Sequence, residues 1–234
     1  MNDNVTINNK NIANYIMFKL DKTTNSFSAD ELSQITELVI DYNNENESNF
    51  VFLNELLKLT ELKKLTLRHG YIYNSDYNVL LRLTNLSSLT FDNCELENAN
   101  LIASLNLKSL SLINCQIRDY SFVNILKDLE ELTIINGNIE VSKINTLQNL
   151  NYLQLSYSTI LDNVSLTIES LKELYIDNTN IMNLDFLTNL KNLHRLSIDK
   201  NQYNKNRYIL STLNKDILVL NENMTEFVGD NDED

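Results

Sequence analysis

The sequence predicts an α/β solenoid, in which short stacked repeats place their strands side by side in one parallel sheet. One leucine returns eight times along the chain, with successive spacings of 27, 24, 21, 22, 21, 21 and 22 residues. A period of this length is typical of a repeat architecture, in which each unit buries its apolar face only against its neighbours. These anchor leucines are Leu38, Leu65, Leu89, Leu110, Leu132, Leu153, Leu174 and Leu196.

Each repeat is predicted to contain one strand followed by a short return segment. Apolar and polar residues alternate around the anchors, as in ELKKLTLRHG and NLSSLTFDNC, and a period of two is that of a β-strand. About 15 residues then lead back to the next strand. That length is short for a full α-helix with two turns, so we expect 3₁₀ turns or brief helices on the convex side.

The ends of the chain differ from the repeats. Residues 11–20 place apolar side chains at helical spacing after Asn8 or Asn9, and a helix there covers the first exposed edge of the repeat core. The sequence therefore predicts four parts. They are an N-terminal helical cap (1–34), about eight repeats (35–203), a C-terminal cap (204–221) and an acidic tail (222–234) that we expect to be disordered.

Two segments carry a family resemblance. FSADELSQITELVI is similar to the junction between cap and first repeat in the bacterial, internalin-like branch of the leucine-rich repeat proteins. NLDFLTNLKNLHRLSIDKN resembles one repeat unit of that branch. The resemblance covers about residues 10–220 and implies a leucine-rich repeat horseshoe with its parallel sheet on the concave face. The proline common in the convex segment of the family is missing here.

The register of the repeats also gives a structural interpretation of both cysteines. Five residues after each anchor lies a bend whose side chain satisfies backbone groups, and the resemblance implies Asn, Cys, Ser or Thr in this slot. Cys94 and Cys115 occupy it, so we expect them to be buried and reduced. Gly70 and Gly137 fill the slot in two other repeats. The predicted ladder residues are Asn43, Cys94, Cys115, Ser158, Thr179 and Asn201.

No residue pattern indicates an enzyme. Neither His69 nor His194 has a Ser or Cys nucleophile and an orienting group in register. Three isolated glycines do not make a phosphate loop, and a structural zinc site needs more Cys or His than lie near the two cysteines. We therefore expect no catalytic activity, no cofactor and no metal.

Charge and hydropathy narrow the class of partner and the compartment. The net charge of −13 argues against nucleic acid, which binds basic surfaces. A basic segment followed by an apolar run is missing near the first residue, and no apolar run reaches the length of about 18 residues that a membrane span needs. We expect a cytoplasmic protein with a protein partner and no membrane or small-molecule partner.

The residues between the anchors form the concave face and supply the candidate binding site. Tyrosine is enriched at protein interfaces because its ring is apolar and its hydroxyl is polar. Neighbouring acidic residues suit a basic partner. The competing interpretation is that the tyrosines simply cover sheet surface, where aromatic residues are favoured. The predicted contact residues are Tyr152, Tyr157, Tyr175, Asp177, Asp199, Glu173, Glu131, Ile113 and Ile135.

Together these patterns predict a non-catalytic module for protein–protein interaction, and the acidic balance suits a basic partner. Two alternatives stay open. The chain is the recognition part of a secreted effector, virulence or surface adhesion protein, or it is an inhibitor or immunity protein that masks a basic toxin or nuclease. The second alternative depends on charge and on analogy of fold.

Overall fold

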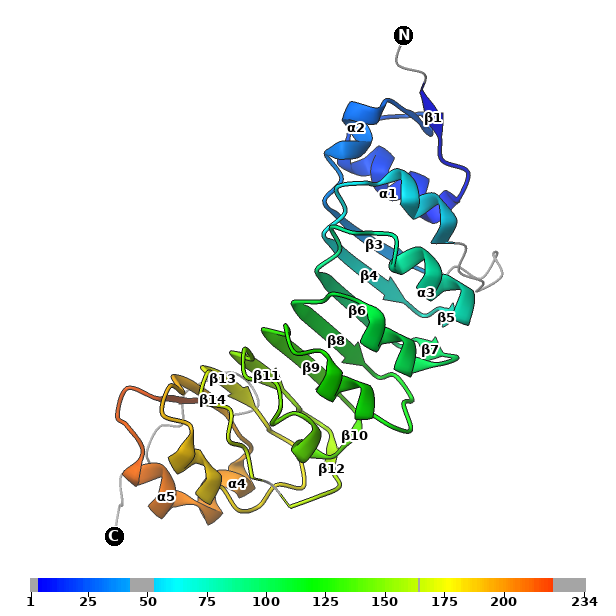
Figure 1. Ribbon diagram of the computed structural model, residues 1–234. Coiled ribbons are helices and arrows are strands. Elements are labelled where there is room, and N and C mark those ends of the chain that lie inside the picture. The colour runs from blue at the N-terminus through cyan, green and yellow to red at the C-terminus, as the bar shows by residue number, and fades with distance from the viewer. Residues whose placement is uncertain (1–3, 43–52, 164, 221–234) are drawn as a thin grey trace. The chain divides into compact units, whose positions relative to one another are not determined.

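A computed structural model of the chain describes residues 4–42, 53–163 and 165–220 (Figure 1). The predicted ladder residue Asn43 and the acidic tail, residues 222–234, lie outside the described residues. Internal contacts divide the chain into two compact units, residues 1–118 (unit 1) and 119–234 (unit 2). Each unit has its own series of parallel strands.

The sheet of unit 1 contains the first four repeat strands, which pair in parallel with the anchor leucines in register. Leu38 pairs with Leu65, Leu65 with Leu89 and Leu89 with Leu110, and all four side chains are at most 1% exposed. The anchors point into the core, and we call the opposite side of the strands the open face. The strands are β3 (Glu37–Asp41), β4 (Lys64–Arg68), β6 (Ser88–Asp92) and β8 (Ser109–Ile113).

Unit 2 repeats this arrangement. Leu132, Leu153, Leu174 and Leu196 pair in register and are completely buried, and Val219 continues the row. The prediction of a parallel leucine-rich repeat sheet is confirmed. The strands are β9 (Glu131–Ile135), β11 (Tyr152–Gln154), β13 (Glu173–Tyr175), β14 (Arg195–Ser197) and β15 (Leu218–Leu220).

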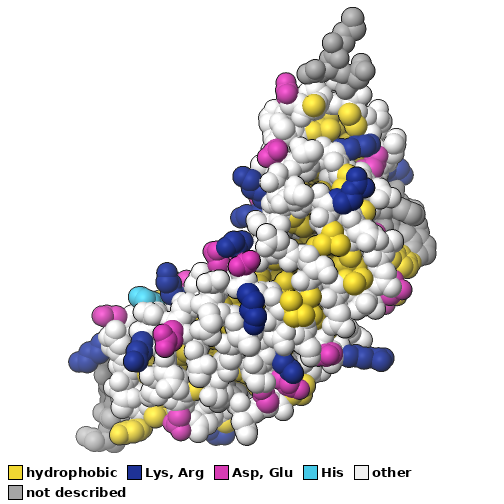
Figure 2. Space-filling view, in the orientation of Figure 1, with side chains coloured by type: hydrophobic (Ala, Val, Ile, Leu, Met, Phe, Trp, Pro, Cys, Tyr) yellow, Lys and Arg dark blue, Asp and Glu magenta, His cyan; other side chains and the backbone are white. Residues whose placement is uncertain are grey.

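Short helical segments return the chain from one strand to the next, as the sequence predicted. Figure 2 shows single charged side chains of both signs scattered among polar and apolar ones on the surface. Six of the segments are η1 (Leu53–Lys58), α3 (Asn74–Leu80), η2 (Ala99–Ser104), η3 (Ser121–Ile125), η4 (Val141–Lys143) and η5 (Asp185–Asn189). Small parallel pairs join the turns: β5 (Tyr71–Ile72) with β7 (Glu95–Leu96), and β10 (Asn138–Ile139) with β12 (Thr159–Ile160).

The first residues of unit 1 form a helix and a short hairpin before the repeats. Helix α1 (Lys10–Lys19) begins after Asn9, whose side chain accepts from the Ile12 amide. Strands β1 (Val5–Thr6) and β2 (Ser26–Phe27) pair antiparallel, and α2 (Ala29–Ser33) begins with a capping box. The carboxylate of Glu55 in η1 accepts from the backbone N–H groups of Asn8 and Asn9, which fixes this segment to the first repeat.

The ladder slot holds buried side chains that contact backbone carbonyl oxygens. The Cys94 thiol lies 3.2 Å from the Leu67 carbonyl oxygen, and the Cys115 thiol lies 3.5 Å from that of Phe91. Ser158 donates to the Ile134 carbonyl, and Thr179 donates to that of Ile176. Burial raises the pKa of both thiols, that of Cys115 to about 12, so both remain protonated at neutral pH.

The expected ladder role of Asn201 is wrong. Asn201 is exposed in the first turn of α4 (Lys200–Lys205), because Asp199 caps a helix at the point where earlier repeats continue into a bend. Its neighbour Gln202 is fully buried instead and reaches back to the previous repeat. The Gln202 side-chain nitrogen lies 3.0 Å from the Ile176 carbonyl oxygen and 2.9 Å from that of Ile181. A second helix, α5 (Arg207–Thr212), follows before β15.

Candidate functional site

The open face of unit 2 carries a pair of tyrosine rings. Tyr152 on β11 and Tyr175 on β13 lie side by side, with ring centroids 5.1 Å apart and planes tilted by 37°. Tyr152 donates to Gln154 at 2.9 Å, and Tyr175 donates to Glu173 at 2.7 Å. Burial, with the nearby Tyr175 and Glu173, raises the pKa of Tyr152 to about 12. Both hydroxyls therefore act as hydrogen-bond donors and remain neutral.

Two of the predicted contact residues are not available at the surface. Tyr175 is 5% exposed and Asp177 is 6% exposed, so the expectation that both are exposed contacts is wrong. The Tyr175 ring packs on Tyr152, and the Asp177 carboxylate lies among donors from neighbouring strands. Alternation along a strand assigned these residues to the correct side, but neighbouring side chains determine how much of each remains exposed.

The carboxylates of this face are engaged in internal bonds. Asp177 accepts from Ser156 at 2.9 Å and from Ser197 at 3.0 Å. Glu173 pairs with Arg195 at 3.2 Å and accepts from Tyr175. Three of the acids predicted to face a basic partner, including Asp199 below, therefore hold the fold together.

Asp199 has two roles at the edge of the sheet. Its carboxylate caps α4 by accepting from the backbone N–H groups of Asn201 and Gln202 at 2.8 and 3.0 Å. The other carboxylate oxygen accepts from the backbone N–H of Asn178 at 3.2 Å. Charge–dipole attraction at a helix start stabilises this arrangement.

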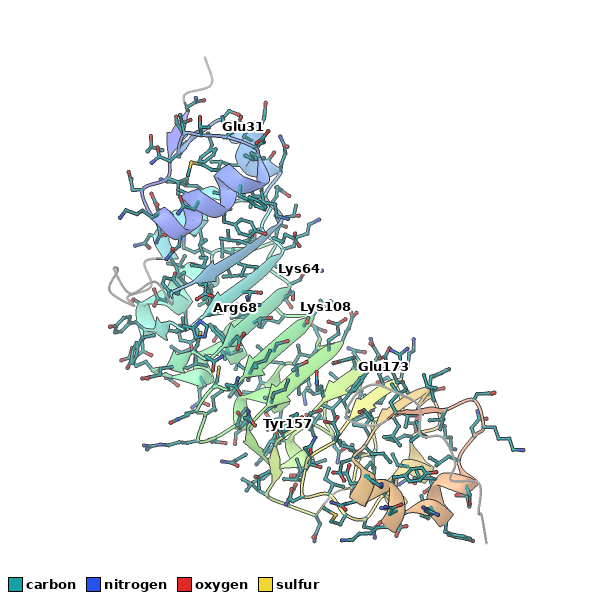
Figure 3. All side chains as sticks on the ribbon, turned by 180° about the vertical axis from the view of Figure 1, so that it is seen from behind. Glu31, Lys64, Arg68, Lys108, Tyr157 and Glu173 are labelled. Carbon is teal, nitrogen blue, oxygen red and sulfur yellow. The ribbon has the colours of Figure 1, made fainter. Side chains whose placement is uncertain are left out.

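The remaining predicted contact residues keep accessible surface. Tyr157, which follows β11, is 57% exposed. Glu131 at the start of β9 is exposed, and Ile135 at its end is half-buried. Figure 3 shows Tyr157 beyond the end of its strand and Glu173 at the start of β13, at opposite edges of the sheet. In unit 1, Ile113 lies at the end of β8 and is also half-buried.

One feature at the carboxyl ends of the strands was not predicted from the sequence: a column of residues with left-handed backbone conformation. Four residues after six successive anchors the backbone has a positive φ between 52° and 60°. This conformation is unfavourable for most residues and least so for Gly and Asn. The repeated Asn was the available signal, because four of the six positions hold it. The column is His69, Asn93, Asn114, Asn136, Tyr157 and Asn178.

Both histidines make local contacts. His69 lies in the left-handed column, and its ring contacts the Asp41 carboxylate at 2.9 Å. The His194 ring contacts the backbone carbonyl of Asn192. Among the described residues, no group of three or more His, Cys, Asp or Glu side chains is placed to hold a metal ion. In the same part of the chain, no helix is long and apolar enough to cross a membrane.

The geometry defines a leucine-rich repeat protein with a partly open sheet face, and the comparisons with solved structures agree on the fold. Internalin C2 of Listeria monocytogenes is similar at 23% identity and a TM-score of 0.68, over 94% of this chain and 98% of that one. Internalin F of the same species has 20% identity and a TM-score of 0.54, over 91% and 74%. A leucine-rich repeat protein of Leptospira interrogans has 24% identity and a TM-score of 0.55, over 71% and 50%.

No protein-family model and no curated protein matches the sequence. At these identities the structural likeness establishes the leucine-rich repeat fold, and function has to be argued from the site.

Proposed function

We propose that the chain is a non-catalytic protein-binding module, whose partner contacts the open face of unit 2. The observation that carries this proposal is the exposed Tyr157 ring beyond the carboxyl end of β11, a strand that begins with Tyr152 of the tyrosine pair. Tyrosine offers a large contact area at a small loss of conformational entropy, and such residues dominate the energy of many protein interfaces. The leucine-rich repeat fold supports the proposal, because solenoids present extended surfaces of this kind.

The internal bonds of the carboxylates change the expected chemistry of the partner. A basic partner is supported by the net charge of −13 and by the exposed Glu131. Glu173, Asp177 and Asp199 support it less, because their oxygens already accept hydrogen bonds within the fold. We infer that Tyr152, Tyr157, Ile135 and Glu131 supply the contacts in unit 2, and that the buried Tyr175 positions Tyr152.

Capture of a partner by the immobilised full-length chain tests the proposal. The wild-type chain is incubated with lysate of its source cells, and a recovered protein is identified by mass spectrometry, purified and titrated against the chain. Ile135→Asp should weaken its binding at least about tenfold, the effect of losing one central contact. Leu161→Asp is the matched control, because Leu161 is 59% exposed and lies beyond β12.

Equal losses for the two variants, or unchanged binding by Ile135→Asp, would contradict the proposed face. Thermal melts of both variants show whether the chain remains folded. A wild-type chain that recovers no stoichiometric partner would count against the binding function itself.

A further inference from the structure

Tyr157 has a backbone conformation that its side chain does not favour. Its φ is 60°, and it is the third residue of a turn closed by the Ser158 N–H, which donates to the Leu155 carbonyl at 3.1 Å. The third position of such a turn takes a positive φ in the type II geometry, where Gly or Asn is preferred. A bulky side chain in the left-handed region is a true outlier.

The two flanking repeats show what the fold selects at this position. In unit 2, Asn136 and Asn178 occupy the equivalent sites in the repeats before and after Tyr157, with φ values of 58° and 56°. Asn tolerates the conformation because its short polar side chain can form a hydrogen bond with a nearby group. The side-chain N–H of Asn178, for example, donates to the Asp177 carboxylate at 3.3 Å. Asn at position 157 would therefore satisfy the turn at a lower free energy.

No polar or ring contact of the Tyr157 side chain within the described part of the fold offsets this cost. The Tyr157 side chain is 57% exposed, and it makes no hydrogen bond, ion pair or ring contact with another described residue. Its backbone N–H donates to the Asp177 carbonyl at 3.1 Å, a bond that any residue except proline would make. Strained residues of this type cluster where a ligand is bound, so the outlier itself points to a contact.

We propose that Tyr157 is an affinity-determining contact residue, retained at a cost in stability, and that it inserts its ring into an apolar pocket on a protein partner. This inference rests on the proposed function and adds to it the energetic role of Tyr157 and a partner chemistry. The partner is apolar at this point because the group that Tyr157 exposes is an aromatic ring, which gains most from burial against apolar atoms. Recognition here depends on burial of the ring more than on charge.

The test combines a stability measurement with a binding measurement on the full-length chain. Tyr157→Asn should raise Tm by about 2–6 °C, since Asn tolerates the left-handed conformation that the turn imposes. It should weaken binding of the purified protein recovered by the capture experiment at least about tenfold. Tyr157→Phe should keep most of the affinity, and the fold-loss caused by Tyr157→Asn should be the same at about 0.05 and 0.5 M salt.

Tyr208→Asn is the matched control for both measurements. Tyr208 is 79% exposed in α5 of the same unit and has no positive φ, so this variant should raise neither Tm nor the dissociation constant. Tyr157→Asn with an unchanged or lower Tm would overturn the stability cost. A partner that binds wild type and Tyr157→Asn equally would overturn only this inference, whereas failure of the wild type to bind any partner would overturn the proposed function.

Discussion

Gln202 is predicted to hold the end of the unit 2 repeats together, and Gln202→Ala tests this directly. Its side-chain nitrogen lies within 3.1 Å of the Ile176 carbonyl, the Thr179 hydroxyl and the Ile181 carbonyl. Its side-chain oxygen accepts from the Asp199 backbone N–H at 2.9 Å. The carboxamide has two N–H groups, so at most two donor bonds are made at full strength, and with the accepted bond they make three.

The magnitude follows from this count. Each buried hydrogen bond contributes about 1 kcal/mol, and a buried group left without a partner costs a further 1–3 kcal/mol or so. Gln202→Ala should therefore lower the free energy of unfolding by about 4–6 kcal/mol, a large share of the roughly 5–15 kcal/mol that a domain has. Urea unfolding followed by far-UV circular dichroism measures the change, provided that the m-value stays constant.

Asn201→Ala is the adjacent control. Its side chain is exposed, so the change should stay within about 0.5 kcal/mol. If the two variants lose the same stability, the hydrogen bonds of Gln202 do not hold the last repeat in place, and this prediction is refuted. A loss confined to Gln202→Ala supports it.

Two further predictions concern unit 1. Burial opposes ionisation of Glu55, but hydrogen bonds from the backbone N–H groups of residues 8 and 9, together with the ion pair to Lys58, outweigh it and lower the pKa below 4.5. The charge therefore stabilises the fold above about pH 4.5, and this contribution is lost as pH falls through the lower folded-state pKa. Glu55→Gln should cost about 1 kcal/mol at pH 7 and nothing at pH 2, whereas exposed Glu95→Gln should show no such trend in urea titrations. Cys94 and Cys115 should react with a thiol reagent only as urea unfolds the chain, and rapid labelling of both in buffer would disprove their ladder role.

The sequence by itself determined the repeat architecture, because the alternation and spacing of the anchor leucines depend only on local strand geometry and on contact with the next repeat. Alternation around Leu65 or Leu153 requires one face of a strand to be buried, and a period near 22 residues requires successive strands to stack. The positions of Cys94 and Ser158 follow from the same register, because the bend after each strand creates the same need for a polar side chain in every repeat.

The tertiary structure decided everything that depends on contacts between repeats. Asp199 caps a helix, and Gln202 instead of Asn201 then contacts the backbone of the previous repeat. Counting five residues from the anchor leucine does not predict this change. Tyr175 and Asp177 lie on the predicted side of the sheet, yet neighbouring rings and hydroxyls bury them. The φ of Tyr157 is set by its turn, and that backbone angle distinguishes this residue from the other tyrosines of the face. Periodicity fixes which way a side chain points, whereas its exposure and strain depend on neighbours about 20 residues away in sequence.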